Sequence, residues 1–447
     1  MRRFMWGLAL ICAVFGVGAY CIFHQAPSSG NAVKEMPPVK DPAPSVTEAR
    51  APAPDAPPVA KTLHALAKDW SGEAVGEHVE KGVKWLASVQ GSDGGWGQDG
   101  GEVSYARKEI KLESNGNDVA NTAVSALAFI RAGHTVTRGV YTANVRKAVE
   151  FVLKHVEDSD DKSLAVNTPQ NTQIQRKLGP NIDTFMASML LAEVDGTMPD
   201  AAANARVRKA VNKIVAKIEK NQSKDGSWNT AGGWAPILGT SYGSRSLDLA
   251  DRKGAQVSKQ ALKSVQDWTV TNAEASIAED KKMASATRSA PGEGAGVATV
   301  AGGGGWGGGS GRPAISASAK GNAGVKLYEY AQTVEQLSRS SKDRTDNALA
   351  IEHMSKELIK DETIRGYGSM GGEEFFSYLN SSDSLHRIGG DSWEKWNTKI
   401  KAHIDGLQNR DGTWSGQHCI TGRVACTAAA VLALLAERAP IEVSMSK

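Results

Sequence analysis

The chain has 447 residues, of which 40% are hydrophobic, enough to build a core and to exclude wholesale disorder. Lys and Arg number 52 against 49 Asp and Glu, so the net charge of +3 gives no general electrostatic case for nucleic-acid binding. Four Cys exclude a scaffold built from disulfides. Trp (11) outnumbers Tyr (8) and Phe (8), and Gly (47) is unusually frequent, so both residue types need an explanation.

Residues 1–24 are expected to form a membrane anchor or a signal segment. Arg2 and Arg3 precede an uncharged, mostly apolar run over residues 5–23. A helix of this length reaches about 28 Å, close to the hydrocarbon thickness of a bilayer. The two arginines favour a cytoplasmic amino end, so the bulk of the chain is expected outside the cytoplasm, in the periplasm if the source is bacterial. Cleavage as a signal peptide stays open as the alternative.

Residues 25–71 are rich in Pro and Ala and are expected to form an extended, semi-rigid linker. From residue 72 to residue 438, apolar residues recur at helical spacing, and strand alternation is nearly absent. The predicted helical segments lie near 73–90, 117–133, 141–157, 182–196, 203–222, 233–252, 257–275, 323–339, 344–360, 371–388, 391–408 and 420–438.

Two kinds of segment alternate along this stretch. One kind is rich in Lys, Arg and Glu, and the other is rich in Ala, Ser, Thr and Leu. The alternation predicts charged helices in an outer layer and small-residue helices in an inner layer. Residues 283–324 are glycine-rich and are expected to form a flexible, disordered insertion, and residues 439–447 a C-terminal tail.

The pattern Gln-x-x-Asp-Gly-x-Trp occurs three times, each time at the end of a charged segment. Asp-Gly supplies a tight turn with a left-handed glycine, and the Gln can bond backbone groups at a helix end. The Trp can cover a large apolar area of the next helix. The residues of this structural repeat are Gln90, Asp93, Gly94, Trp96, Gln222, Asp225, Gly226, Trp228, Gln408, Asp411, Gly412 and Trp414. The repeat accounts for part of the excess of Trp and Gly.

The first copy extends upstream through Lys81, Gly82 and Trp85, and it resembles the QW repeat of squalene and terpene cyclases. Related toroids occur in protein prenyltransferase β-subunits and in complement thioester domains. The resemblance covers residues 72–437 and implies an all-α fold, an (α/α)6 toroid of about twelve helices in two concentric layers. It also implies a central cavity that could hold an isoprenoid or another lipid.

The catalytic motifs of these families are not reproduced. The run Asp158-Ser159-Asp160-Asp161 resembles the Asp-x-Asp-Asp motif of cyclases that protonate an alkene, but it ends a charged helix, where a solvated turn is expected. Neither Cys419 nor Cys426 is followed by the Gly-Glu-Gln of thioester domains.

Protein prenyltransferases hold zinc through Asp, Cys and His, and His418, Cys419 and Cys426 are the comparable candidates in this chain. Spacing marks no fourth ligand for zinc. We therefore expect Cys426 to pack within a helix and Cys419 to lie at a helix start, with their pairing left open, and neither a metal nor another cofactor.

The sequence Gly371-Gly372-Glu373-Glu374-Phe375 matches a signature of diguanylate cyclases, but its flanks are helical. We expect it to begin an inner helix, where the helix dipole favours two acids. The candidate catalytic residues are Glu373, Glu374, Asp183 and Asp118, if the inner helices bring them to the cavity. Capping or packing is the alternative role for each of them.

These observations predict a membrane-anchored, cyclase-like toroid that binds a lipid, an isoprenoid or a protein without catalysis, and no nucleic acid. An isoprenoid-processing enzyme that uses the central cavity and a structural repeat scaffold are the alternatives. A deep apolar pocket with a buried carboxylate would favour the enzyme, whereas a closed or polar-lined centre would favour the scaffold.

Overall fold

The computed structural model describes residues 70–101, 116–167, 172–228, 236–289, 323–366 and 370–439. All of them belong to one of two compact units, Thr62–Lys447. The expected membrane segment, most of the expected linker and all but the first residue of the C-terminal tail lie outside the described residues. No helix of the described part is long and apolar enough to cross a bilayer.

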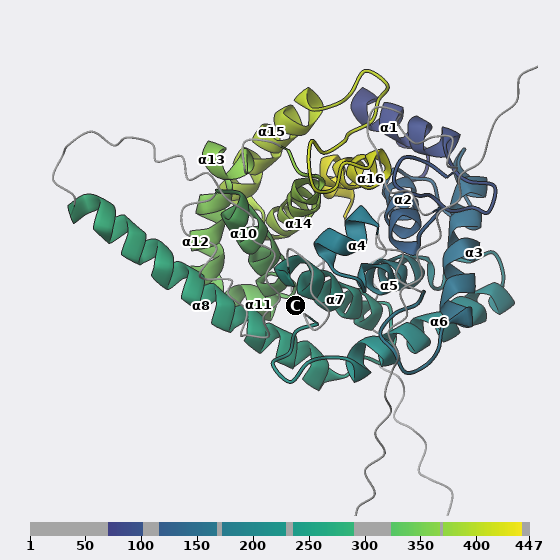
Figure 1. Cartoon of the computed structure of the whole chain (residues 1–447), viewed down its shortest axis with the longest axis horizontal. Coiled ribbons are helices and arrows are strands. Elements are labelled where there is room, and N and C mark those ends of the chain that lie inside the picture. Colours follow the sequence, from purple (N-terminus) through teal and green to yellow (C-terminus); the bar gives the residue numbers. More distant parts are fainter. Residues whose placement is uncertain are drawn as a thin grey trace, which may run out of the picture. The chain divides into compact units, whose positions relative to one another are not determined.

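Six of the described helices form an inner ring. They are α2 (Val119–Arg131), α5 (Ile182–Val194), α7 (Pro236–Arg252), α10 (Ala323–Leu337), α14 (Gly372–Ile388) and α16 (Arg423–Leu434). Each packs against the next, and α16 packs against α2, so the ring is closed (Figure 1).

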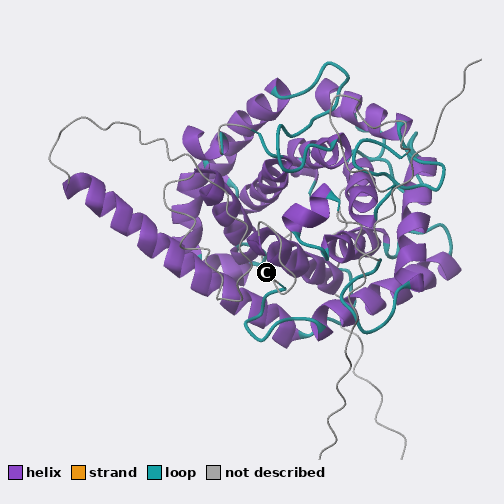
Figure 2. Cartoon of the chain, viewed as in Figure 1, coloured by secondary structure: helices purple, strands orange, loops and turns teal. Residues whose placement is uncertain are grey.

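Six longer or more polar helices surround this ring. They are α1 (Glu77–Ser88), α3 (Thr142–Asp158), α6 (Ala201–Lys220), α8 (Lys259–Ser289), α12 (Ala348–Leu358) and α15 (Gly390–Gly406). Short helices lie in the connections: α4 (Gln173–Leu178), α11 (Ser341–Asp346), α13 (Asp361–Ile364) and the 3-10 helix η2 (Ala436–Arg438). Figure 2 shows two concentric layers of helices and no strand within the described part, as the (α/α)6 toroid predicts.

The division into layers follows from composition. Helix α5 is buried over its whole length except Glu193, so it lies inside. Helix α6 buries one stripe that includes Val207, Val211 and Ile214, and its charged positions other than Lys217 are exposed or partly exposed. A helix that is apolar on all sides needs cover on all sides, whereas a one-sided helix needs solvent on the other.

Helix α8 is longer than predicted. It runs on to Ser289, past the expected end near residue 275 and into the start of the expected insertion, and α10 already begins at Ala323. The stretch after residue 275 contains no Gly or Pro before Pro291, so nothing in the sequence stops the helix there.

The three Gln-x-x-Asp-Gly-x-Trp turns fold alike and join neighbouring outer helices. In each, the Gln side-chain amide donates to the Gly carbonyl of its own turn and to a carbonyl in the first turn of the next outer helix. These outer acceptors are Asn144 O in α3 at 3.0 Å, Ala261 O in α8 at 3.0 Å and His78 O in α1 at 2.8 Å. The third bond links the last outer helix, α15, to the first and closes the outer ring.

Each Trp of the turns joins its own outer helix to the following inner helix. The indole N–H donates to the carbonyl ten residues earlier, at Leu86, Ile218 and Ile404, over 2.9, 2.8 and 2.7 Å. The backbone N–H donates to an inner-helix hydroxyl, at Thr122, Thr240 and Thr427, over 2.9, 3.4 and 3.0 Å. The turns therefore fix both layers at once, and the threonine is a member of the repeat that the sequence analysis missed.

All six inner helices run in the same direction. Ala120 N in α2 donates to Asp183 in the first turn of α5, and Gly371 before α14 forms a bridge with His418 before α16. The inner helices therefore begin on one face of the toroid, here called the N-terminal face, and end on the other, the C-terminal face.

Candidate metal-binding site

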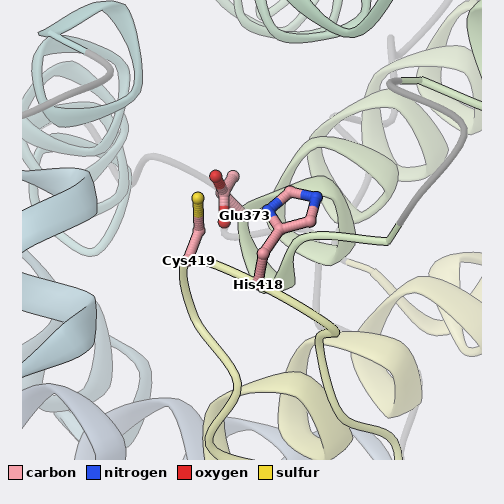
Figure 3. A group of neighbouring side chains, drawn as sticks. All are labelled: Glu373, His418 and Cys419. Atoms are coloured by element: carbon pink, nitrogen blue, oxygen red, sulfur yellow. The ribbon is translucent and has the colours of Figure 1, made fainter. Parts of the chain in front are cut away.

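Glu373, His418 and Cys419 meet on the N-terminal face, between the starts of α14 and α16 (Figure 3). One possible ligand atom from each lies within 4.8 Å of the others. Glu373 is buried in the first turn of α14, whereas His418 and Cys419 are half-buried in the loop that leads into α16.

Two consecutive glycines let this loop approach α14. Gln417 N donates to Met370 O over 2.6 Å, and the bridge from Gly371 to His418 continues this pairing. A Cβ at Gly371 would lie 2.8 Å from His418 Cε1, and one at Gly372 would clash with the carbonyl of Ile420. A larger residue at either position would therefore force the loop before α16 or the Glu373 side chain to shift.

Cys419 has an unusual backbone conformation. Its φ of +61° is the only positive value at a non-glycine residue in the described ranges. Such a conformation costs on the order of 1–3 kcal/mol, and it is retained where the surroundings enforce it. In Figure 3 the Cys419 side chain points toward the Glu373 carboxylate.

The environment of the three groups disfavours the charged form of the thiol, and the acid beside it is buried. Neither carboxylate oxygen of Glu373 has a hydrogen-bond partner of ordinary geometry among the described residues, although both are buried. Burial raises the pKa of the Cys419 thiol to about 11, the negative charge of Glu373 adds to the rise, and Lys177 opposes it. The site therefore holds a buried carboxylate beside a thiol that stays protonated.

A divalent metal ion fits this arrangement. Carboxylate, imidazole and thiolate are the usual ligands of zinc, and tetrahedral bonds of about 2.0–2.3 Å place ligand atoms roughly 3.3–3.8 Å apart. The possible ligand atoms of the three side chains lie within 4.8 Å of one another, so they would have to move closer together to bind one ion. A dication would also supply the charge that a buried carboxylate requires. Three protein ligands leave a fourth position open, as in zinc sites that act on other molecules.

The other candidates from the sequence lie apart from this cluster. Cys426 is buried in the first turn of α16, and its thiol donates to Ile420 O over 3.6 Å. Cys419 and Cys426 are both free thiols. The third candidate ligand beside His418 and Cys419 is thus Glu373, whereas the sequence analysis grouped Cys426 with them.

The remaining acids of the N-terminal face bind helix starts. Asp118 accepts from Asn121 N over 2.8 Å as the N-cap of α2, and Glu374 accepts from Gly371 N before α14. Asp183 accepts from Ala120 N over 3.0 Å and from the amide of Gln175 over 2.6 Å. Burial raises the pKa of both Asp118 and Asp183, that of Asp118 to about 7 with the charge of Asp183 as the second cause.

The Asp-x-Asp-Asp run lies at the end of the outer helix α3. Asp158 ends α3, and Asp160 accepts from Lys162 N over 2.6 Å and from Ser163 N over 2.7 Å. Asp161 is exposed and faces Lys213 at 3.3 Å. The run forms a solvated turn and is not placed to protonate a substrate inside the ring.

The interior toward the C-terminal face is filled by charged side chains. Asp383 in α14 accepts from Arg131 in α2 over 2.8 and 3.1 Å, and also from Arg245 in α7. Helix α16 separates α14 from α2 in the ring, and α10 separates α14 from α7, so both ion pairs cross the interior. The sequence analysis did not single out these residues, although charges within otherwise small-residue helices were a visible signal.

The two closed rings define an α/α toroid as the class of this protein. The family model described as the squalene-hopene cyclase C-terminal domain matches residues 58–167, so the resemblance to the squalene and terpene cyclase superfamily is confirmed over that stretch.

Similarity to other known proteins is low. Among solved structures, an inactive variant of an α-1,6-mannanase from Salegentibacter sp. HEL1_6, in complex with α-1,6-mannotriose, gives a TM-score of 0.49 at 7% identity. The match covers 81% of this chain and 98% of that chain. No curated protein matches the sequence.

Proposed function

We propose that this protein is a membrane-anchored α/α toroid that binds zinc through Glu373, His418 and Cys419 and takes a ligand at the open position of the metal. The observation that carries the proposal is the buried Glu373 carboxylate, whose oxygens have no hydrogen-bond partner among the described residues and face an imidazole and a thiol. The apolar run over residues 5–23, behind Arg2 and Arg3, supports the anchor and an extracytoplasmic toroid.

The chemistry of the site favours some ligands over others. A metal bound by one thiolate, one imidazole and one carboxylate accepts a further soft or oxygen donor, such as a thiolate, a carboxylate or a water molecule. An isoprenoid hydrocarbon offers none of these donors. The ion pairs of Asp383 also make the interior charged, which argues against an apolar substrate that extends through the ring.

The test is metal analysis of the full-length protein, purified in detergent and loaded with zinc. Wild type is expected to retain one zinc per chain after desalting, whereas Cys419→Ser and Glu373→Gln are expected to lose it. Cys426→Ser removes the neighbouring buried thiol outside the cluster and serves as the matched control. Equal zinc in wild type and Cys419→Ser would refute the proposed ligand set, as would no zinc in wild type.

Cobalt substitution gives a second readout of the same ligand set. Wild type and Cys426→Ser are expected to show the absorption band of a thiolate bound to cobalt, and Cys419→Ser is expected to lack it. Lipid extraction and mass spectrometry of the same preparation test the isoprenoid alternative. A stoichiometric isoprenoid in a preparation that binds no zinc would replace the metal-site proposal.

A further inference from the structure

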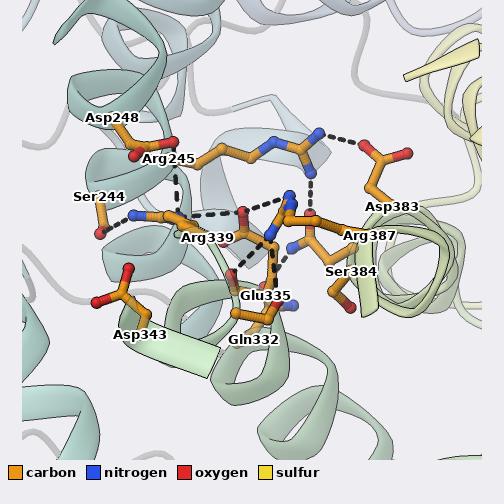
Figure 4. A network of polar contacts seen from close by, with 12 residues as sticks. Ser244, Arg245, Asp248, Gln332, Glu335, Arg339, Asp343, Asp383, Ser384 and Arg387 are labelled. Atoms are coloured by element: carbon orange, nitrogen blue, oxygen red, sulfur yellow. Dashed lines mark hydrogen bonds and ion pairs between the residues drawn. The ribbon is translucent and has the colours of Figure 1, made fainter. Parts of the chain in front are cut away.

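A second polar cluster lies at the C-terminal face, and Figure 4 shows most of it. It joins α2, α7, α10 and α14 and is here called the arginine network. Its guanidinium groups belong to Arg131, Arg245, Arg252, Arg339 and Arg387, and its carboxylates to Asp248, Glu335 and Asp383.

The central carboxylates of the network are ionised. Burial alone would raise the pKa of Asp383, but the charges of Arg131 and Arg245 outweigh it and hold the pKa below its usual value. Glu335 is likewise buried, and the charges of Arg339 and Arg245 nevertheless lower its pKa to about 2. Five guanidinium groups against three carboxylates give the network a net charge of +2, although each guanidinium has a carboxylate within 4.0 Å.

Among the central groups of the network, the arginines are more exposed than the acids. The side chains of Asp383 and Glu335 are 2% exposed, whereas those of Arg131 and Arg245 are 12% exposed. Arg387 keeps 8% of its side-chain surface exposed. Glu335 and Asp383 therefore lie beneath the arginines. Asp248, 25% exposed beside Arg252 at 31%, is the carboxylate that an ion from solution would also meet.

Arg387 has the weakest compensation in the network. Its Nη1 donates to Glu335 O over 3.3 Å and to Ser338 Oγ over 3.2 Å, and Nη2 lies 3.8 Å from Glu335 Oε1. Arg339, by contrast, pairs with both oxygens of Glu335, over 2.6 and 3.2 Å. Burial lowers the pKa of Arg387 to about 10, the sign of a cation short of counter-charge.

A neutral donor of the same cluster is also unused. Gln332 is fully buried in α10, and its side-chain oxygen accepts from Asn380. Its Nε2 has no hydrogen-bond partner among the described residues. A buried N–H donor without an acceptor costs about 1–3 kcal/mol, so an acceptor brought by a ligand would be stabilising.

We propose that the arginine network binds a phosphate-type dianion, held mainly by the guanidinium of Arg387. The net charge of +2 matches a dianion, and the planar fork of Arg matches two oxygens of phosphate. The site lies at the opposite face from Glu373 and His418, so it is independent of the metal-site proposal. The phosphate can come from a soluble phosphomonoester or from a lipid headgroup, because both present the same group.

The dipoles of the inner helices provide the competing explanation. Each helix end carries about half a negative charge, and several such ends on the C-terminal face stabilise arginines there without any ligand. That explanation predicts a network whose stability is the same in phosphate and in chloride at equal ionic strength.

The experiment is calorimetric titration of the full-length protein with inorganic phosphate at constant ionic strength. Wild type is expected to bind one phosphate, and Arg387→Met is expected to bind it roughly tenfold more weakly or not at all. Arg206→Met is the matched control, because Arg206 pairs with Glu150 and Glu157 on the outer surface. Absence of binding in wild type, or equal binding by Arg387→Met, would overturn the proposal.

Two further measurements keep the test decisive. If Arg387→Met does not fold, Arg387→Lys keeps the charge without the fork and is expected to weaken phosphate binding by a smaller factor. Glycerol 3-phosphate and vesicles of phosphatidate, with phosphatidylcholine vesicles as control, then separate the sources. Binding of the soluble compound alone assigns a free phosphomonoester, binding of phosphatidate vesicles alone assigns a headgroup, and binding of neither contradicts the site.

Discussion

Asp383→Asn is expected to destabilise the toroid more than any substitution of a surface acid. The change keeps the size of the side chain and removes its charge. Asp383 is 2% exposed and is bound by Arg131 and Arg245, so its loss leaves two buried guanidinium groups without their carboxylate. Removing one partner of a buried ion pair costs about 3–5 kcal/mol, because the remaining charge stays buried.

Urea unfolding, followed by the fluorescence of buried Trp96, Trp396 and Trp414, measures this loss. Asp391→Asn is the control: its carboxylate is 95% exposed and lies 3.9 Å from Lys395, so the expected change is within about 0.5 kcal/mol. A free energy of unfolding for Asp383→Asn within about 1 kcal/mol of wild type would refute the buried-pair reasoning.

Three other predictions concern the metal site, a helix cap and a repeat turn. The thiol of Cys419 has a pKa of about 11 and zinc binds the thiolate, so the apparent zinc affinity should rise about tenfold per pH unit between roughly pH 7 and 9. Titration calorimetry in buffers of different ionisation heat should show that one proton is released on binding. An affinity that does not change with pH would argue against thiolate binding. The folded-state pKa of Asp118, about 7, exceeds its unfolded value, so part of the wild-type stability is lost as pH rises from about 4 to 7. In urea unfolding at several pH values, the free energy of unfolding of Asp118→Asn should therefore rise relative to that of wild type over this window. A difference between the two proteins that does not change with pH would contradict the prediction. Gly226→Ala should lower the free energy of unfolding by about 1–3 kcal/mol, because φ is +90° and the new Cβ would clash with Ser264 O. Gly406→Ala, at a position with open space around it, should be neutral or stabilising in the same assay. Equal effects of the two substitutions would disprove the turn argument.

The overall fold is predictable from this sequence because its local signals agree. Helical periodicity locates the segments, and the Gln-x-x-Asp-Gly-x-Trp turns state how neighbouring helices are joined. Helices α4, α11 and α13 are too short to show a period, so the sequence analysis missed them. The sequence places the end of α8 too early, because the low-complexity stretch expected to start at residue 283 overlaps the last turns of the helix.

The candidate site was predictable only in parts. Sequence reasoning names Glu373 as a candidate acid and His418 and Cys419 as candidate ligands of a metal that it does not expect, and it keeps them in separate groups. Their meeting depends on the close approach of two loops over Gly371 and Gly372, which no local pattern reveals. Nearness along the chain suggested Cys426 instead, although the first turn of α16 directs its thiol to a backbone carbonyl.

The arginine network was missed for a different reason. The composition of whole segments predicts an outer position for charged helices. It does not mark the single charges Arg245, Glu335 and Asp383, which lie in the inner helices. A charge in a helix that needs burial on all sides must find its partner inside the fold, and such residues therefore predict contacts across the ring.

The bond from Gln408 to His78 means that the toroid has no first and no last repeat. An open solenoid needs polar capping repeats at both ends, whereas here each repeat caps its neighbour. The chain ends of the ring also meet: Arg438 lies 4.9 Å from the ring of Trp70 and donates to Ala74 O over 2.8 Å. The ring of repeats is thus continuous in space. A circularly permuted chain that began at another outer helix could make the same contacts.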